Sequence, residues 1–135
     1  MKILVADDSF SWQEYHKNLL EEIFIELGID NYKIDTANWA KDAYDLIMQN
    51  INEPYRLIIS DLQMEDDYRP DYAGEWLVKQ IKTFKSYLNS KIIICSGCYN
   101  IKQIAETLNA DYVPKRVAIT DINSYKNIVI NLLKY

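Results

Sequence analysis

The chain has 135 residues, which suits one domain with one hydrophobic core, and its 49% hydrophobic and 26% charged residues are typical of a soluble globular protein. A net charge of −5 argues against a general nucleic-acid surface, which needs a basic patch, and against docking on anionic membranes. The sequence contains no apolar run of membrane-spanning length and no signal-peptide pattern, so we expect a cytoplasmic protein.

Short apolar runs alternate with helical patterns along the whole chain. In order, the predicted elements are a strand at Ile3–Ala6, a helix at Ser11–Leu27, a strand at Tyr32–Thr36, a helix over residues 39–50, a strand at Leu57–Ser60, a helix at Ala73–Leu88, a strand at Lys91–Cys95, a helix at Ile101–Leu108, a strand at Tyr112–Val113, and a last helix capped by Thr120 or Asp121. Ser11 and Glu14 are predicted to form a capping box, and Asn38 to cap the second helix.

This order is a strand followed by a helix, repeated five times. The strands are apolar rather than alternating, although Tyr32–Thr36 is weaker, as expected when helices cover both faces of a sheet. Because crossover connections are right-handed, the pattern predicts an α/β fold with a doubly wound, five-stranded parallel sheet and five helices. We expect one domain over residues 1–135.

Polar side chains follow four of the five predicted strands. In open parallel sheets, ligands bind outside the carboxyl ends of the strands, so residues far apart in sequence meet there. The residues that this fold brings to one edge are Asp7, Asp8, Asp61, Ser96, Gly97 and Lys115. The sequence therefore predicts a site that combines three carboxylates, a hydroxyl group and an ammonium group.

Three close carboxylates repel one another, and a hard divalent cation removes that conflict. Mg²⁺ is typically held by one or two carboxylates together with waters and phosphate oxygens. Lys115 can hold a phosphoryl oxygen or Asp61, and Ser96 can donate to another phosphoryl oxygen. These groups match phosphoryl transfer, in which carboxylates can also be nucleophiles that form aspartyl phosphate.

Four segments resemble the landmark motifs of response-regulator receiver domains, in the right order: "ILVADD", "LIISDLQM", "IIICSG" and "DYVPK". The resemblance spans essentially the whole chain and is closest to stand-alone, chemotaxis-type regulators without an output domain. It implies a flavodoxin-like fold with the strand order 2-1-3-4-5.

The resemblance also assigns roles to single residues. Asp61 is implied to be the phosphorylated aspartate. Asp8, Asp61 and the backbone carbonyl of Gln63 are implied to bind Mg²⁺ directly, and Asp7 to act through water. Ser96 and Tyr112 correspond to the switch hydroxyl and switch aromatic residue, and Lys115 to the lysine that contacts the phosphoryl group.

The implied partners are a histidine kinase or a histidine phosphotransfer protein, which donates the phosphoryl group, and a downstream protein. The downstream protein would bind the face of the fourth helix, fifth strand and fifth helix. No nucleic acid or membrane is expected as a direct partner. The chain would catalyse only its own phosphorylation and dephosphorylation, so we do not expect an enzyme that turns over an external substrate.

The sequence departs from the family at three places. Glu65 and Arg116 stand where the family often has proline, and the acidic loop over residues 65–72 is longer than usual. The departures leave open a pseudo-receiver, which would be a docking module not controlled by phosphorylation. A phosphatase with Asp61 as nucleophile is a remote alternative, because Gln63 occupies the position where such enzymes often have a second acid.

The two cysteines, Cys95 and Cys98, have C-x-x-C spacing, which leaves a thiol redox module as a further alternative. Cys95 is also the last residue of a predicted strand, where a free cysteine behaves as a small buried hydrophobe. His16 is predicted to lie on the surface of the first helix. The stripe formed by Trp12, Tyr15, Leu19 and Ile23 is predicted to be core packing.

Overall fold

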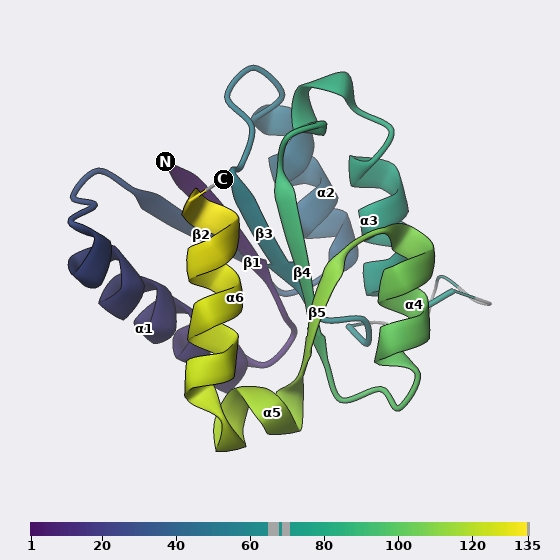
Figure 1. Ribbon diagram of the computed structural model, residues 1–135. Coiled ribbons are helices and arrows are strands. Elements are labelled where there is room, and N and C mark those ends of the chain that lie inside the picture. The colour runs from purple at the N-terminus through teal and green to yellow at the C-terminus, as the bar shows by residue number, and fades with distance from the viewer. Residues whose placement is uncertain (65–67, 69–70, 135) are drawn as a thin grey trace.

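The computed structural model describes residues 1–64, residue 68 and residues 71–134. Of the acidic loop predicted over residues 65–72, Glu65, Asp66 and Asp67 therefore lie outside the described residues. The remainder folds into three layers, with a central sheet between two layers of helices (Figure 1).

The sheet has five parallel strands in the order β2-β1-β3-β4-β5, which confirms the doubly wound, flavodoxin-like topology. The strands are β1 (Lys2–Ala6), β2 (Lys33–Ala37), β3 (Leu57–Ser60), β4 (Lys91–Ser96) and β5 (Asp111–Pro114). The chain reverses direction along the sheet after β2, and β1 and β3 become neighbours. This reversal creates the switch point at which such sheets bind ligands.

Six α-helices are described, one more than the sequence predicts. They are α1 (Phe10–Leu27), α2 (Ala40–Gln49), α3 (Ala73–Ile81), α4 (Ile101–Leu108), α5 (Lys115–Thr120) and α6 (Ile122–Lys134), with a 3-10 turn η1 at Lys85–Tyr87. The additional helix is α5, a short segment between β5 and the predicted last helix. Asp121 does cap that last helix, because its Oδ1 accepts a hydrogen bond from the backbone N–H of Ser124 at 3.3 Å. Within the described part of the chain, no helix is long and apolar enough to cross a bilayer.

The two faces of the sheet carry separate hydrophobic cores, because side chains alternate along each strand. On β3, Ile58 faces the core that α2, α3 and α4 cover. Leu57 and Ile59 face the core that α1, α5 and α6 cover. Both faces of β1, β3 and β4 are buried, which explains why these central strands read as apolar runs.

Two predicted helix N-termini are wrong. Ser9, not Ser11, caps α1, and its Oγ accepts a hydrogen bond from the backbone N–H of Trp12 at 3.3 Å. Trp39 occupies the N-cap position of α2, whereas Asn38 accepts a hydrogen bond from Gln13 Nε2 at 2.5 Å. The first helix thus begins one residue earlier than predicted, and the N-cap residue of α2 makes no side-chain capping hydrogen bond.

The third predicted helix is too long. It ends at Ile81 and gives way to a turn in which Phe84 N–H donates to the carbonyl of Ile81 at 3.1 Å. Leu77 and Ile81 face the core as predicted, but Leu88 is 84% exposed. The regular helix therefore ends one turn after Leu77, and the 3-10 turn that follows buries Tyr87 in the same core and leaves Leu88 in solvent.

His16 is buried, in contrast to its predicted place on the surface. Only 1% of its area is exposed, and its Nδ1 lies 2.7 Å from the hydroxyl of Tyr125 in α6. Burial, with a smaller contribution from the charge of Lys115, lowers the pKa of His16 to about 3. His16 is thus a neutral core residue that connects α1 to α6.

We expect His16 to weaken the fold as the pH falls. The unfolded imidazole takes up a proton below about pH 6.5, whereas the folded one stays neutral until about pH 3. The contribution of His16 is therefore complete above pH 6.5 and is lost progressively below it. At pH 5 this linkage removes about 2 kcal/mol. Urea unfolding of wild type and His16→Asn at pH 7.5 and 5 measures it, and an equal loss in both proteins would contradict the expectation.

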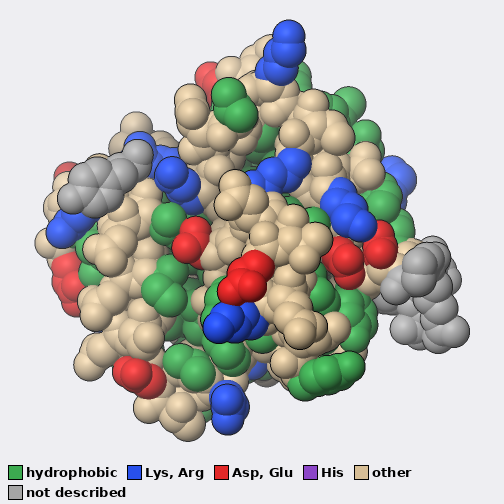
Figure 2. All heavy atoms as spheres, turned by 45° about the vertical axis from the view of Figure 1, so that its right-hand side comes forward, with side chains coloured by type: hydrophobic (Ala, Val, Ile, Leu, Met, Phe, Trp, Pro, Cys, Tyr) green, Lys and Arg blue, Asp and Glu red, His purple; other side chains and the backbone are tan. Residues whose placement is uncertain are grey.

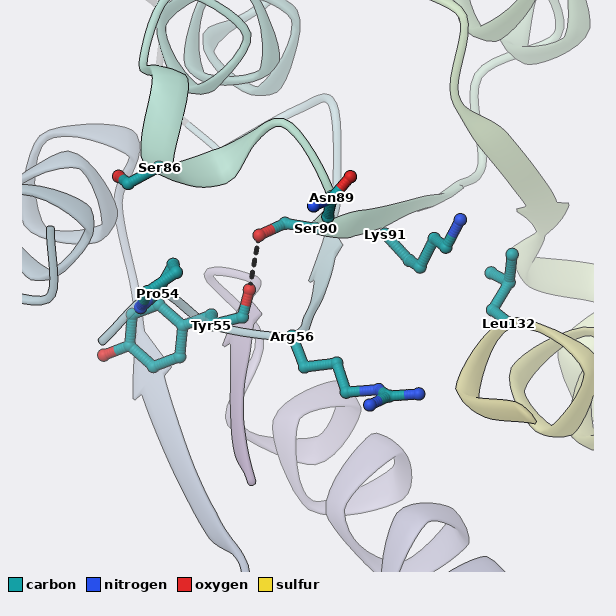
Figure 3. A pocket seen from close by; sticks show the side chains of 8 residues that line it. All are labelled: Pro54, Tyr55, Arg56, Ser86, Asn89, Ser90, Lys91 and Leu132. Atoms are coloured by element: carbon teal, nitrogen blue, oxygen red, sulfur yellow. Dashed lines mark hydrogen bonds between the residues drawn. The ribbon is translucent and has the colours of Figure 1, made fainter. Parts of the chain in front are cut away.

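A pocket of about 400 Å³ lies at the amino-terminal end of the central strands (Figure 3). Arg56, just before β3, and Lys91, the first residue of β4, line it together with Ser90 and Leu132. Ser90 Oγ donates to the carbonyl of Tyr55 at 2.6 Å across one side. The pocket is thus at the opposite edge of the sheet from the strand ends that carry the aspartates.

Candidate functional site

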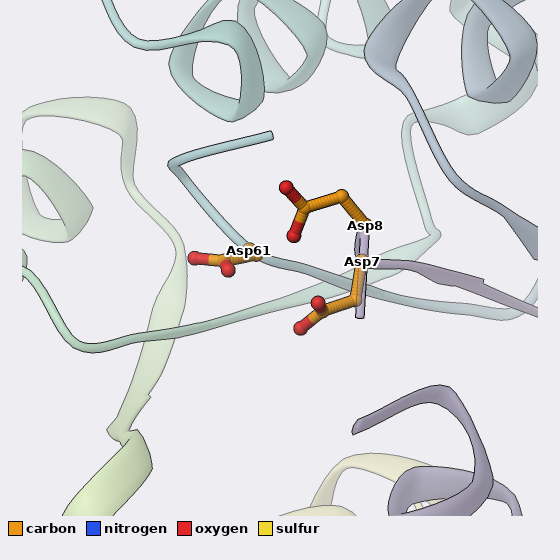
Figure 4. A group of neighbouring side chains, drawn as sticks. All are labelled: Asp7, Asp8 and Asp61. Carbon is orange, nitrogen blue, oxygen red and sulfur yellow. The ribbon is translucent and has the colours of Figure 1, made fainter. Parts of the chain in front are cut away.

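The three predicted aspartates meet at the carboxyl edge of the sheet. Asp7 and Asp8 follow β1, and Asp61 follows β3, the neighbouring strand. The register pairs Ala6 with Ser60, and Asp61 N–H donates to the carbonyl of Ala6 at 2.9 Å. One carboxylate oxygen from each aspartate lies within 4.8 Å of the other two. Figure 4 shows all three side chains projecting to the same side of the strand ends.

Lys115 joins this cluster from the first turn of α5. Its Nζ lies 2.8 Å from Oδ2 of Asp61 and 3.0 Å from Oδ2 of Asp7. Burial lowers the pKa of Lys115, but the hydrogen bonds and charges of the two carboxylates outweigh it, so the pKa is raised. Lys115 is therefore a firmly charged group that offsets two buried carboxylates.

Asp61 is held by the backbone that follows it. Its Oδ1 accepts hydrogen bonds from the N–H groups of Leu62 at 2.6 Å and Gln63 at 3.3 Å, and its Oδ2 accepts from Lys115. Only 5% of Asp61 is exposed. The carboxylate is thus fixed in orientation, and one of its two oxygens faces the lysine.

Asp7 is the deepest of the three carboxylates. Its Oδ1 accepts a hydrogen bond from Ser9 N–H at 2.9 Å, whereas its buried Oδ2 has no hydrogen bond besides the ion pair with Lys115. Burial raises the pKa of Asp7, and the nearby charge of Asp61 adds to the increase, against the opposing effect of Ser9 and Lys115. The cluster therefore holds more negative charge than its own residues compensate.

These residues fit a hard divalent cation. Carboxylate oxygens are the ligands that Mg²⁺ and Mn²⁺ prefer, and an under-satisfied Oδ2 of Asp7 leaves capacity for an added positive charge. Asp8 is exposed and borders solvent, so water can reach the cluster. The donor set would hold the ion between Asp7, Asp8 and Asp61.

Gly74 supports the site in a way that the sequence reading missed. A Cβ atom at this position would lie 1.9 Å from the carbonyl oxygen of Asp61 and 2.8 Å from the Cα of Leu62. The N–H of Gly74 also donates to the carbonyl of Leu62 at 2.9 Å. The first turn of α3 can approach the backbone of Asp61 only without a side chain. A glycine at the start of a predicted helix, where propensity disfavours it, was the available signal.

The other predicted residues lie around the same edge. Ser96 ends β4, is fully buried, and accepts a hydrogen bond from Cys98 N–H at 3.2 Å. Tyr112 is half-buried in β5 and packs against the core that α2, α3 and α4 cover. Gln63 lies two residues after Asp61, with an exposed side chain. Their predicted roles toward a metal ion or a phosphoryl group stay predictions.

The C-x-x-C pair gives no support to a thiol redox module. Both cysteines are free. Cys95 belongs to the core on the α1 side of the sheet, and Cys98 to the core on the α3 side. Burial raises the pKa of Cys95 to about 12, so its thiol is a poor nucleophile at neutral pH.

Comparison with known proteins gives matches to solved structures alone. No family profile and no curated protein sequence matches the chain. A signal receiver domain of a two-component histidine kinase from Clostridium thermocellum matches with a TM-score of 0.72 and 20% identity, over 99% of this chain and 98% of that chain. The chemotaxis response regulator CheY4 of Vibrio cholerae matches with a TM-score of 0.61 and 22% identity, over 84% and 85%. The Mn²⁺-bound form of response regulator Rcp1 matches with a TM-score of 0.63 and 16% identity, over 99% and 92%.

These matches define the class of fold. The described sheet, its strand order and its helices have the architecture of response regulator receiver domains, over nearly the full length of those domains. At 16–22% identity, this likeness is a likeness of fold.

Proposed function

We propose that this protein is a response regulator receiver that accepts a phosphoryl group on Asp61 and thereby switches a partner-binding face. The observation that carries the proposal is the convergence of Asp7, Asp8, Asp61 and Lys115 at one sheet edge. A receiver fold by itself is compatible with many functions. This fold together with three carboxylates and a lysine at its switch point favours phosphoryl transfer.

The proposed chemistry uses the carboxylate of Asp61 as nucleophile. One of its oxygens forms a bond to phosphorus while the bond from phosphorus to the donor's imidazole nitrogen breaks, and that nitrogen keeps the electron pair. When bound at the aspartates, Mg²⁺ supplies positive charge that offsets the phosphoryl oxygens. Lys115, now 2.8 Å from Asp61, would turn to a phosphoryl oxygen, and the hydroxyl of Ser96 would donate to another.

Two observations support a resident divalent cation. The single lysine does not balance the negative charge of three carboxylates, and the under-satisfied Oδ2 of Asp7 and the exposed Asp8 can still interact with a cation or its waters. In addition, a structurally similar response regulator, Rcp1, has been solved in a Mn²⁺-bound form. We propose Mg²⁺ as the ion, held by Asp8, Asp61 and the carbonyl of Gln63, with Asp7 acting through water.

The proposed partners are a histidine kinase or a histidine phosphotransfer protein as donor, and a downstream protein. The downstream protein would read the face of α4, β5 and the helices that follow, with Tyr112 as the residue that responds to phosphorylation. The free cysteines suit the reducing cytoplasm, which we propose as the compartment. On the face shown in Figure 2, basic side chains are interspersed with acidic ones, and no extended basic surface for nucleic acid is seen there.

The test is phosphorylation by acetyl phosphate, followed by intact-mass spectrometry. We expect the wild-type protein to gain one phosphoryl group in the presence of Mg²⁺ and to gain none after chelation with EDTA. The Asp61→Asn variant should gain none under either condition, because the nucleophile is lost. The adduct should be released by hydroxylamine, as an acyl phosphate is.

Asp111→Asn is the matched control. This exposed carboxylate begins β5 and belongs to neither the aspartate cluster nor its ion pairs, so the variant should be labelled like wild type. Labelling that persists in Asp61→Asn would overturn the proposal. A wild-type protein that stays unlabelled while it binds a partner would instead indicate a pseudo-receiver.

A further inference from the structure

Trp12 lies beside the aspartate site without being one of its predicted residues. It is in the first turn of α1, which starts two residues after Asp8. The Nζ atom of Lys115 lies 4.9 Å from the centroid of the Trp12 ring. A lysine ammonium within about 6 Å of an indole ring is attracted by the ring's negative face. Lys115 thus has an aromatic partner in addition to the two carboxylates.

The ring of Trp12 is itself held in place. Tyr15 packs edge-on against it, with ring centroids 5.3 Å apart, and His16 lies at 5.5 Å. Tyr15 donates a hydrogen bond to the carbonyl of Ala118 in α5, the helix that begins with Lys115. His16 contacts the hydroxyl of Tyr125 in α6 at 2.7 Å. The platform under Lys115 therefore joins α1, α5 and α6.

We propose that Trp12 is a positioning residue for Lys115. A lysine has a flexible four-carbon stem, so contacts with surrounding groups are needed to hold its ammonium in one position. Asp61 and Asp7 attract the ammonium electrostatically, and once a phosphoryl group occupies Asp61 the ammonium must change partners. The ring of Trp12 is a partner that remains through this change and keeps the ammonium near the reacting oxygens. This role rests on the proposed function of the site.

The expected effect is on the rate of phosphorylation. A partly desolvated cation–π contact to tryptophan accounts for roughly a tenfold factor. We expect Trp12→Leu to slow labelling by acetyl phosphate about tenfold, and Trp12→Phe, which keeps an aromatic face, to have an intermediate rate. Trp76→Leu is the matched control. Trp76 is also half-buried, but it packs against Tyr44 at 5.4 Å on the opposite face of the sheet.

A double-mutant cycle separates positioning from simple packing. If Trp12 acts through Lys115, Trp12→Leu should slow labelling no further in a Lys115→Met background. A slowing by the same factor with and without Lys115 would overturn the proposal. If the wild-type protein is labelled and Trp12→Leu is labelled at the same rate, the proposal is also overturned. The proposed function of the site would then stay intact. If the wild-type protein itself takes up no phosphoryl group, the proposed function fails first and the role of Trp12 fails with it.

A second measurement needs no phosphorylation and does not depend on the stability of the Lys115→Met variant. In NMR spectra of the wild-type protein, the methylene protons next to the Lys115 ammonium should be shifted upfield by the Trp12 ring. Trp12→Leu should remove this shift, and Trp76→Leu should leave it unchanged. An unshifted resonance in wild type would mean that the ammonium does not rest on the ring, and would overturn the proposal.

Discussion

The Gly74→Ala variant is expected to lose about 3 kcal/mol of unfolding free energy, at the upper end of overpacking effects. The added methyl group would lie 1.9 Å from the carbonyl oxygen of Asp61, well inside van der Waals contact. The methyl group is attached rigidly to the α3 backbone and the atoms that it meets are backbone atoms, so neither side can turn away as a flexible side chain would. Either α3 moves away from β3, or the residues after β3 shift and carry the Asp61 carboxylate with them.

Urea unfolding measures the stability loss, and Mg²⁺ titration of the folded variant measures the displacement of Asp61. Gly97→Ala is the matched control, because a Cβ atom there meets nothing within 4 Å and its backbone conformation is open to other residues. Gly97→Ala should unfold at the wild-type urea concentration. If Gly74→Ala did the same, the close approach of α3 to Asp61 would be refuted.

The Lys115→Met variant is expected to lose about 3 kcal/mol when no divalent cation is present, because it leaves buried carboxylates without their partner. Lys115 contacts Asp61 at 2.8 Å and Asp7 at 3.0 Å, and both carboxylates are buried. Methionine preserves the length and much of the volume of the side chain, so the loss reports on the charge. Added Mg²⁺ should restore part of the stability, since it brings positive charge to the same oxygens.

The loss should also depend on pH. The pKa of Asp7 is already raised by burial, and removal of Lys115 raises it further. A protonated Asp7 carries no charge that Lys115 has to offset. The difference in unfolding free energy between Lys115→Met and wild type should therefore be largest at neutral pH and should shrink as the pH falls through the raised pKa of Asp7. The effect of burial on the pKa of His16 is common to both proteins and cancels in the difference, which leaves only the smaller contribution of Lys115.

Lys41→Met is the control for Lys115→Met. Lys41 forms an exposed ion pair with Asp45 at 2.7 Å on α2, where water screens both charges. Its removal should leave the urea unfolding curve in place. Unfolding of Lys115→Met at the wild-type urea concentration would show that the aspartates do not depend on this lysine.

The sheet and the position of the site follow from local patterns. Short apolar runs such as Leu57–Ser60 are typical of strands buried on both faces, and the right-handed crossover then orders them. The polar residues that end β1, β3, β4 and β5 must then share one edge. Asp61 and Lys115, which are 54 residues apart in sequence, could be placed together for that reason.

Element ends and side-chain environments were predicted less well. Ser9 and Ser11 are equally good caps by residue type, so the residue types do not reveal that Ser9 is the one that caps α1. Leu88 follows the helical spacing of Leu77, yet the helix ends before reaching it. His16 lies four residues after Trp12 and three before Leu19, on the inward face of α1. Histidine is polar and is therefore predicted to be exposed. A buried imidazole needs a hydrogen-bond partner, here Tyr125, which the sequence does not reveal.

The sequence alone determined the order of the strands and of every α-helix except α5, the parallel sheet, and the edge at which the aspartates and the lysine gather. These features depend on local periodicity and on a strong rule of chain handedness. Only the tertiary structure decided which groups touch. The approach of Gly74 to Asp61, the ring of Trp12 beside Lys115 and the burial of His16 against Tyr125 join segments whose distance depends on how helices pack on the sheet. Such contacts depend on ångström-scale packing between helices and sheet, which leaves little trace in the residue types of either segment.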